Sequence, residues 1–444
     1  MNSFKRFALL AASLLPLLGY ADPTLAQDAT QIATGVSQET KFIFNTLLFL
    51  MAGFMVMWMA AGFAMLEAGM VRSKNVATIC TKNIALYSIA GLMYWLVGYN
   101  LMYMDVNGGW FGTLTWFDHP THSAEDIGYA AATSDWFFQM VFCATAASIV
   151  SGTLAERIKL WPFLIFCALL TGLIYPIPGA WKWGKGWLET AGFLDFAGST
   201  IVHSVGGWAA LVGALILGPR LGKYDTSGRI NPMPGSSMPL ATLGTFILWL
   251  GWFGFNGGSQ LAMGSLADAS DVARIFANTN TAAAAGVVAA MLATQALYKK
   301  VDLTMALNGA LAGLVSITAE PLTPPMPMAA LIGAVGGVIV VFTVPLLDKI
   351  KIDDVVGAIP VHLMCGIWGT LAVPLTNSGA TFSAQLLGIG AVAVFVCSAS
   401  AVLWLVLKHT MGIRASEDDE LVGLDKAELG LEAYPEFGQP SASG

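Results

Sequence analysis

DFAGSTIVH at residues 195–203 and DVVGAIPVH at residues 354–362 follow one pattern, Asp-x-x-Gly-x-x-x-Val-His. The first copy runs into the apolar segment SVGGWAALVGALILG (204–218), and an apolar run also follows the second. His203 and His362 therefore fall in segments hydrophobic enough to lie in a membrane. An ionisable side chain is costly to hold there and usually marks an ion or proton path.

The composition of the chain indicates an integral membrane protein. Of its 444 residues, 56% are hydrophobic and only 11% are charged, whereas a soluble domain carries about a quarter charged residues. The cysteines all lie in apolar runs without a C-x-x-C pair, which argues against disulfides and a zinc site. We expect no metal and no cofactor. The cysteines are Cys80, Cys143, Cys167, Cys365 and Cys397.

The first 26 residues resemble a signal peptide. Lys5 and Arg6 form a positive start, FALLAASLLPLL (7–18) is an apolar core, and small residues near Ala21 and Ala26 suit cleavage. A cleaved leader would put the mature N-terminus outside a bacterial cytoplasmic membrane. The alternative is a retained first helix, although the apolar run is short for a span.

Eleven apolar runs in the mature part are long enough to cross a bilayer, so the sequence predicts an all-α polytopic protein. Lys and Arg gather in alternate connections, such as ERIK (156–159) and GPRLGKYDTSGR (218–229), while 105–135 has none. The positive-inside rule then places the N-terminus outside and the C-terminus inside. The expected spans are 42–68, 79–103, 135–155, 160–178, 197–218, 238–257, 273–297, 303–320, 328–347, 356–375 and 383–408.

The two histidines lie five expected spans apart, so their segments should run in opposite directions. That is the pattern of a five-plus-five inverted repeat, whose halves meet at a substrate path near the membrane midplane. Asp195 and Asp354 stand eight residues before the histidines and suit caps for their helices. The expected domain is 27–408, with halves 42–218 and 238–375, an extra helix 383–408, and a polar tail 409–444. The tail is either solvated or a docking surface.

Two buried imidazoles from opposite halves can share one proton, one ring nitrogen donating and the other accepting. A histidine with a reference pKa of about 6.5 suits proton relay near neutral pH. The plainer alternative is a hydrogen-bonded core histidine, and metal binding is weaker because suitable third and fourth ligands do not appear nearby.

Over almost the whole mature chain the sequence resembles the ammonium transporter family (Amt/Mep/Rh). The resemblance implies a homotrimer of eleven-helix subunits, each with its own pore for ammonium or ammonia and its analogue methylammonium. The motifs that carry it are GFAMLEAGMVRSKN (62–75), FCATAASIVSGTLAERI (142–158), DFAGSTIVH (195–203), GWFGFNGGS (251–259) and VHLMCGIWGT (361–370).

The resemblance also implies roles for individual residues. The outer recruitment site corresponds to Phe138, Trp183 and Ser259, a stacked phenylalanine gate to Phe142 and Phe255, and the paired pore histidines to His203 and His362. Asp195 matches the acidic residue that supports the outer site.

In the tail, GLDKAELGLEAY (423–434) is similar to a segment that contacts PII signalling proteins in bacteria. Leu429 replaces a histidine that is common there, and Val355 replaces a frequent proline after Asp354.

Ammonium and potassium are similar in size, so chemistry has to separate them. Aromatic faces attract a partly dehydrated cation by about 0.5–2 kcal/mol each, and a serine hydroxyl accepts an N–H bond from ammonium. In a dry constriction a bare cation costs at least about 3 kcal/mol. Ammonium can lose a proton there and potassium cannot.

Two other functions remain open: an ammonium sensor whose tail reports occupancy, and an uncharged channel for ammonia or carbon dioxide. An enzyme is not expected, because the sequence contains no nucleophile–base pair or phosphate loop, and nothing points to nucleic acid. Each aromatic also has a plainer reading, since Phe138 and Phe142 have helix-packing spacing and Trp183 suits an interfacial anchor.

Overall fold

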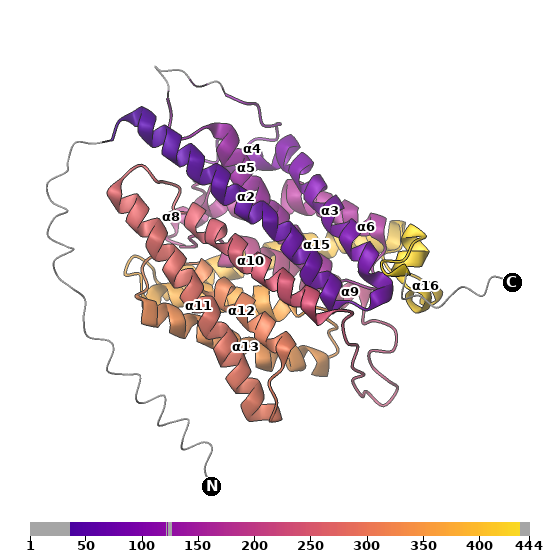
Figure 1. Cartoon of the computed structure of the whole chain (residues 1–444). Coiled ribbons are helices and arrows are strands. Elements are labelled where there is room, and N and C mark those ends of the chain that lie inside the picture. Colours follow the sequence, from indigo (N-terminus) through magenta and orange to yellow (C-terminus); the bar gives the residue numbers. More distant parts are fainter. Residues whose placement is uncertain (1–35, 121, 123–126, 436–444) are drawn as a thin grey trace, which may run out of the picture. The chain divides into compact units, whose positions relative to one another are not determined.

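A computed structural model describes residues 36–120, 122 and 127–435. Within these ranges the chain is helical and contains no β-strand beyond two isolated bridges, and its helices lie side by side (Figure 1). The long helices are α2 (Gln38–Met70), α3 (Val76–Met93), α5 (Ala132–Thr153), α10 (Met238–Gly258), α11 (Leu266–Tyr298), α12 (Leu303–Thr318), α13 (Met326–Lys349) and α15 (Phe382–Thr410).

Shorter helices and turns complete the bundle. They are η4 (Ser73–Asn75), η5 (Tyr94–Gly98), α4 (Tyr99–Tyr103), α6 (Leu160–Leu169), η6 (Leu170–Ile174), α7 (Pro176–Lys182), α8 (Trp187–Thr190), η7 (Ser199–Ser204), α9 (Val205–Leu217), η8 (Ile359–Met364), α14 (Cys365–Ala372), η9 (Val373–Leu375), α16 (Glu417–Val422) and η10 (Asp425–Leu429).

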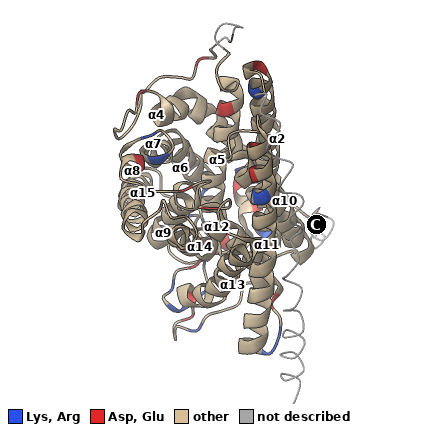
Figure 2. Cartoon of the chain, turned by 90° about the vertical axis from the view of Figure 1, so that its left-hand side faces the viewer, with Lys and Arg blue, Asp and Glu red and all other residues tan. Residues whose placement is uncertain are grey.

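Nine continuous helical stretches of the described chain are long and apolar enough to cross a membrane. Two shorter apolar helices, Leu303–Thr318 and Ile359–Leu375, fall on the other two runs that the sequence marks as spans. Charged residues occupy only short parts of the helices, and most of each helix is uncharged (Figure 2). The all-helical membrane class is therefore confirmed, whereas the proposed leader 1–26 lies outside the described residues.

Several helical stretches differ in length from the expected spans. The stretch expected at 160–178 continues through α7 and α8 to Thr190, and Trp183 is the C-terminal cap of α7. α11 begins at Leu266, seven residues before the expected start at 273, because Ser265 caps it by accepting a hydrogen bond from the Asp268 N–H. A polar capping residue, rather than the limit of the apolar run, sets the start of α11.

Small residues let the helices pack closely. α10 runs along α2, and a Cβ added at Gly244 would lie 2.2 Å from the Leu66 nitrogen. α11, α12 and α13 form a second closely packed group, in which a Cβ at Gly286 would lie 2.2 Å from the Gly309 carbonyl oxygen. Close backbone approach through glycine is typical of packed membrane helices, where lipid supplies no hydrophobic drive between them.

The two ends of the bundle differ. One end, here called the loop face, carries the described parts of the connection between α4 and α5, residues 104–120, 122 and 127–131. The other end, the tail face, carries α16 and η10, which lie beside the starts of α3 and α6 (Figure 1). Asp425 fastens η10 by accepting the N–H groups of Ala77 and Thr78, at 3.0 and 2.7 Å, and the Thr78 hydroxyl at 2.9 Å.

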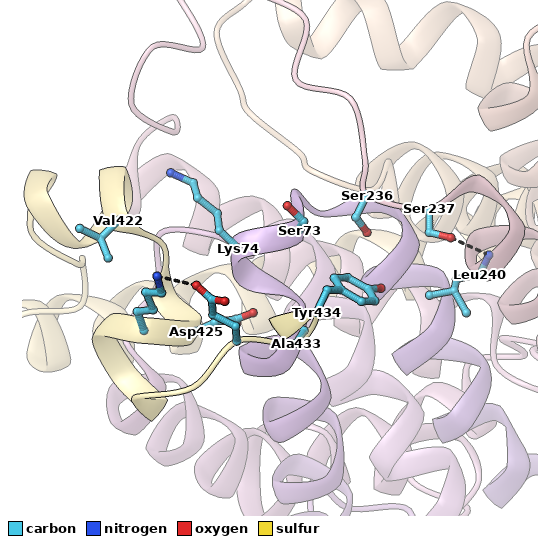
Figure 3. Close-up of a pocket in the computed structure, with 11 residues that line it drawn as sticks. Ser73, Lys74, Ser236, Ser237, Leu240, Val422, Asp425, Ala433 and Tyr434 are labelled. Atoms are coloured by element: carbon cyan, nitrogen blue, oxygen red, sulfur yellow. Dashed lines mark hydrogen bonds and ion pairs between the residues drawn. The ribbon is translucent and has the colours of Figure 1, made fainter. Parts of the chain in front are cut away.

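A cavity of about 480 Å³ remains between the tail, the start of α3 and the segment before α10 (Figure 3). Lys74 lines it and donates from Nζ to the carbonyl oxygens of Glu420 and Leu421, each at 2.6 Å. The described tail is therefore docked on its own bundle rather than solvated along its length.

Buried ion pairs close the tail face. Arg220 donates to both carboxylate oxygens of Asp353 at 2.9 Å and lies 3.3 Å from Glu156. Glu156 also pairs with Arg72 at 2.5 Å. Arg157 donates to the Asp353 carbonyl oxygen at 2.6 Å, so this cluster joins the ends of α2, α5, α9 and the segment before η8.

Candidate functional site

The structure brings His203 and His362 together at the centre of the bundle. Their Nδ1 atoms lie 3.2 Å apart, and their rings are 5.2 Å apart and tilted by 24°. Both side chains are almost fully buried, with exposed fractions of 0% and 3%. At this distance one Nδ1 donates and the other accepts, so two neutral rings must adopt opposite tautomers.

Each histidine lies in a short π-helical segment, His203 in η7 and His362 in η8. A π-helical turn widens the helix and is frequent at functional sites. From these two segments the imidazoles face each other. The sequence pattern predicts the pair but contains no signal for the π geometry.

Asp195 holds the start of η7. Its carboxylate accepts four backbone N–H bonds, from residues 198, 199, 200 and 201, at 2.9–3.0 Å. Such an arrangement requires the sharp turn at Gly198, whose φ of +108° suits glycine. The four donors are the free N–H groups of a helix start, which a carboxylate satisfies well.

Asp354 has the matching place before η8. It accepts the Ile359 N–H at 2.7 Å and the Thr153 hydroxyl at 3.1 Å, and Gly357 turns the chain with a φ of +80°. The repeated Asp-x-x-Gly therefore has the same local task in both copies.

The two copies of the Asp-x-x-Gly-x-x-x-Val-His motif approach the centre of the bundle from opposite ends of α12. Ala197 donates its N–H to the Thr318 carbonyl oxygen at 3.1 Å, whereas Asn308 donates to the Val356 carbonyl oxygen at 3.3 Å. Since an α-helix rises about 1.5 Å per residue, these points lie about 15 Å apart along α12. The histidines meet between them.

A row of aromatic rings leads from the histidines toward the loop face. Phe255 stacks on His203 with centroids 5.2 Å apart, and Phe142 stacks on Phe255 at 3.9 Å with a 20° tilt. Phe138 follows at 4.7 Å from Phe142. His203 also stacks on Trp252 at 4.9 Å, and Trp252 lies 5.7 Å from Phe255, so these two rings form an apolar wall beside the imidazole.

The loop-face end of this row contains Trp183 and Ser259. Trp183 lies edge-on to Phe142 at 6.2 Å, and its indole N–H donates to the Asp195 carbonyl oxygen at 2.9 Å. The Ser259 hydroxyl donates to the Phe255 carbonyl oxygen at 2.8 Å. Because its proton is engaged in α10, the Ser259 oxygen keeps its lone pairs free to accept from a ligand.

On the tail side of the histidines lies a small cavity that the sequence reasoning missed. Its space for the centre of a water-sized molecule is about 10 Å³, which is about enough for one such molecule. His362, Phe63 and Glu67 line it, together with Asn308 and Val356.

Asn308 and Val356 also line a wider cavity of about 420 Å³ at the tail face, so the small cavity lies between the histidines and this vestibule. The sequence alone could have pointed to Glu67 as a functional residue, because it is a carboxylate in an apolar run.

Comparisons with known proteins identify the family of the chain. Residues 47–434 match the model of the Ammonium Transporter Family. The chain is 42% identical over 420 residues to ammonium transporter Amt2 of Archaeoglobus fulgidus, covering 87% of each chain. It is 41% identical over 433 residues to the putative ammonium transporter sll1017 of Synechocystis, covering 96% of this chain and 97% of the other.

Two solved structures extend the comparison to the fold. One is named Sensor Amt Protein, with a TM-score of 0.82, 36% identity, and coverage of 88% of this chain and all of that one. The other is Mep2 of Candida albicans, with a TM-score of 0.78, 27% identity, and coverage of 92% and 94%. The resemblance inferred from the sequence is thus confirmed, and the chain belongs to the ammonium transporter family.

Proposed function

We propose that this chain carries ammonium across a membrane, entering at the loop face and leaving at the tail face. One observation carries the proposal: two facing histidines lie directly behind a stacked pair of phenylalanines, His203 stacking on Phe255 at 5.2 Å. Rings alone would block any solute, and histidines alone would not select one. Together they suit a solute that can shed a proton.

Ammonium is recruited at the loop-face end of the ring row. Phe138 and Trp183 offer aromatic faces to a cation, worth about 0.5–2 kcal/mol each. The Ser259 oxygen accepts one N–H from the bound ion, and its own proton is held by the Phe255 carbonyl oxygen. Potassium has no N–H to donate, so this contact favours ammonium.

The stacked rings of Phe142 and Phe255 form the gate. A bare cation in this dry constriction costs at least about 3 kcal/mol, so ammonium gives up a proton there and passes as ammonia. Ammonia then hydrogen-bonds along His203 and His362, and the imidazoles pass the proton onward. No cofactor is needed for these steps.

The membrane arrangement is also a proposal: eleven spans in an N-out, C-in topology, built as a five-plus-five inverted repeat. The entry of η7 and η8 from opposite ends of α12 supports the inversion. The tail face then lies in the cytoplasm of a bacterial cell, the membrane is the cytoplasmic one, and the subunits form a homotrimer. The docked tail around Leu429 is where a PII protein would act on the transporter.

An ammonium sensor is the second candidate function. The structural neighbour named Sensor Amt Protein, at 36% identity, favours keeping it. An uncharged gas channel for ammonia or carbon dioxide is the third. The docked tail fits either a transporter or a sensor, so flux has to separate them.

Methylammonium pulses applied to the full chain in vesicles, with current and internal pH recorded together, distinguish the three functions. We expect a saturable inward current in the wild type. Alkalinisation without current would support the gas channel, and absence of any flux would support the sensor; either result would overturn the proposed transport of charge.

A further inference from the structure

The small cavity behind His362 contains a buried carboxylate with an incomplete set of partners. Glu67 on α2 is 1% exposed, and its Oε2 accepts from the Ser151 hydroxyl at 2.8 Å and from the Asn83 amide at 3.2 Å. Its Oε1 has no hydrogen-bond partner anywhere in the described chain. A buried acceptor without a partner is costly and calls for a ligand or a water molecule.

A buried cation, Lys82, lies next to Ser151, which also contacts Glu67. Lys82 on α3 is fully buried, and within the described residues its one side-chain hydrogen bond runs from Nζ to the Ser151 carbonyl oxygen at a long 3.5 Å. Its Nζ also lies 4.8 Å from the centre of the Phe163 ring. Ser151 thus links the acid and the base, donating to Glu67 and accepting from Lys82.

Two buried ionisable groups with so few hydrogen-bond partners stabilise a fold poorly. Apolar residues of similar volume would cost less than a buried pair with incomplete hydrogen bonds. Ionisable residues inside a membrane segment usually belong to a path for ions or protons. The position fits such a path, because Glu67 and His362 line one cavity with room for about one small molecule.

We propose that Glu67, with Lys82 as its counter-charge, is the station where ammonia and the relayed proton recombine before entering the tail-face vestibule. The inference rests on the proposed transport with a proton relay. It adds the step that this mechanism lacks, because ammonia leaving the histidines must regain a proton to leave as ammonium.

The step balances as two proton transfers. The histidine pair takes up the gate proton on one ring nitrogen as an N–H bond on another breaks, so the pair stays neutral. An O–H bond forms on the Glu67 carboxylate, directly or through one water in the cavity. The O–H bond then breaks as an N–H bond forms on ammonia, which leaves a carboxylate and ammonium. The proton that ammonia gains replaces the one released at the gate. The positive charge of Lys82 balances the negative charge of the Glu67 carboxylate before and after the transfer.

The competing explanation is that Glu67 merely neutralises Lys82. The other ionisable groups near the pair are His362, Arg157, Glu428 and the thiols of Cys80 and Cys167. Removing both charges separates the explanations: Glu67→Gln/Lys82→Gln keeps the cavity neutral and similar in size but leaves no carboxyl to carry a proton.

The experiment uses the full chain in vesicles, with ammonium-evoked current and methylammonium uptake measured on the same preparation. A positioned proton-transfer group contributes about 10²–10⁴-fold, so we expect the charge moved per methylammonium to fall by at least about tenfold in the double variant. Glu67→Asp, which keeps a carboxyl, should recover part of it. Glu39→Gln/Lys41→Gln removes an exposed acid and an exposed base at the start of α2 and should leave the ratio as in the wild type.

A double variant with the wild-type ratio would overturn the station and leave Glu67 as a counter-ion. A wild type that takes up methylammonium without current would overturn the relay itself, which is a separate result. Infrared difference spectra of the wild type on ammonium addition guard against a variant that does not fold. The spectra should contain a change in a carboxylic acid C=O band. Spectra without that change would also overturn the proposal.

Discussion

Phe142 and Phe255 lie face to face with centroids 3.9 Å apart and a tilt of 20°, one from α5 and the other from α10. Both rings are buried, with exposed fractions of 1% and 0%. Because the stack joins two helices that approach from different parts of the chain, its closure depends on the bundle and not on one flexible loop.

Substitution at this stack should change ion selectivity. We expect Phe142→Ala to admit water and to let potassium pass, because the constriction no longer forces a cation to be bare. A barrier lowered by about 3 kcal/mol corresponds to about a hundredfold more flux. Potassium-evoked current in vesicles measures the effect, and Phe142→Leu, which keeps an apolar plug, is the control. Potassium current at background in Phe142→Ala would contradict the gate.

The tail should detach when its carboxylate anchor is removed. Asp425→Ala deletes the acceptor of two backbone N–H groups and one hydroxyl at the start of α3. Bonds to a charged acceptor are worth about 1.5–3 kcal/mol each. Amide exchange at Ala77 and Thr78 should therefore quicken by at least about tenfold.

Asp418→Ala is the matched control for the tail, because Asp418 is an exposed carboxylate on α16. Hydrogen exchange followed by mass spectrometry measures the amide exchange rates at Ala77 and Thr78 in both variants. Equal exchange rates in the two variants would show that Asp425 does not fasten the tail.

The ion pairs at the tail face predict a pH dependence of stability. Burial by itself raises the pKa of Asp353, but hydrogen bonds from Arg220 and the charges of Arg157 and Arg220 outweigh it and hold the pKa well below its usual range. An acid with a lowered folded pKa stabilises the fold above its unfolded pKa, near 4, and loses that contribution as pH falls through the folded value.

Asp353→Asn tests this linkage. Breaking a buried pair costs about 3–5 kcal/mol, so the variant should melt well below the wild type near neutral pH. The difference in melting temperature should stay constant down to about pH 5 and narrow below about pH 4. A difference that stays constant into strong acid would contradict the assigned role of the carboxylate.

The membrane class and the histidine pair could be read from the sequence for a physical reason. Long apolar runs are required by the lipid that surrounds a membrane helix. The repeated Asp-x-x-Gly-x-x-x-Val-His motif marks a repeated local structure, because Asp195 and Asp354 both accept N–H groups at a helix start. These are local constraints, so they leave local patterns.

The station at Glu67 could not be assembled from the sequence in the same way. Its partners Asn83 and Ser151 come from two other helices, and Lys82 meets it only through Ser151. Each charge in an apolar run was visible by itself, but the meeting depends on how α2, α3 and α5 pack. The sequence likewise contains no signal for the π-helical turns at the histidines.

The imidazole pair is tested most directly by removing it. Ammonium-evoked current in vesicles, recorded for the wild type, for His203→Ala/His362→Ala and for the exposed control His409→Ala, isolates its contribution. We predict that the double variant loses at least about nine-tenths of the current, as expected for loss of a proton-transfer group, while the His409 control retains it. A double variant with unaltered current and unaltered selectivity against potassium would contradict the relay.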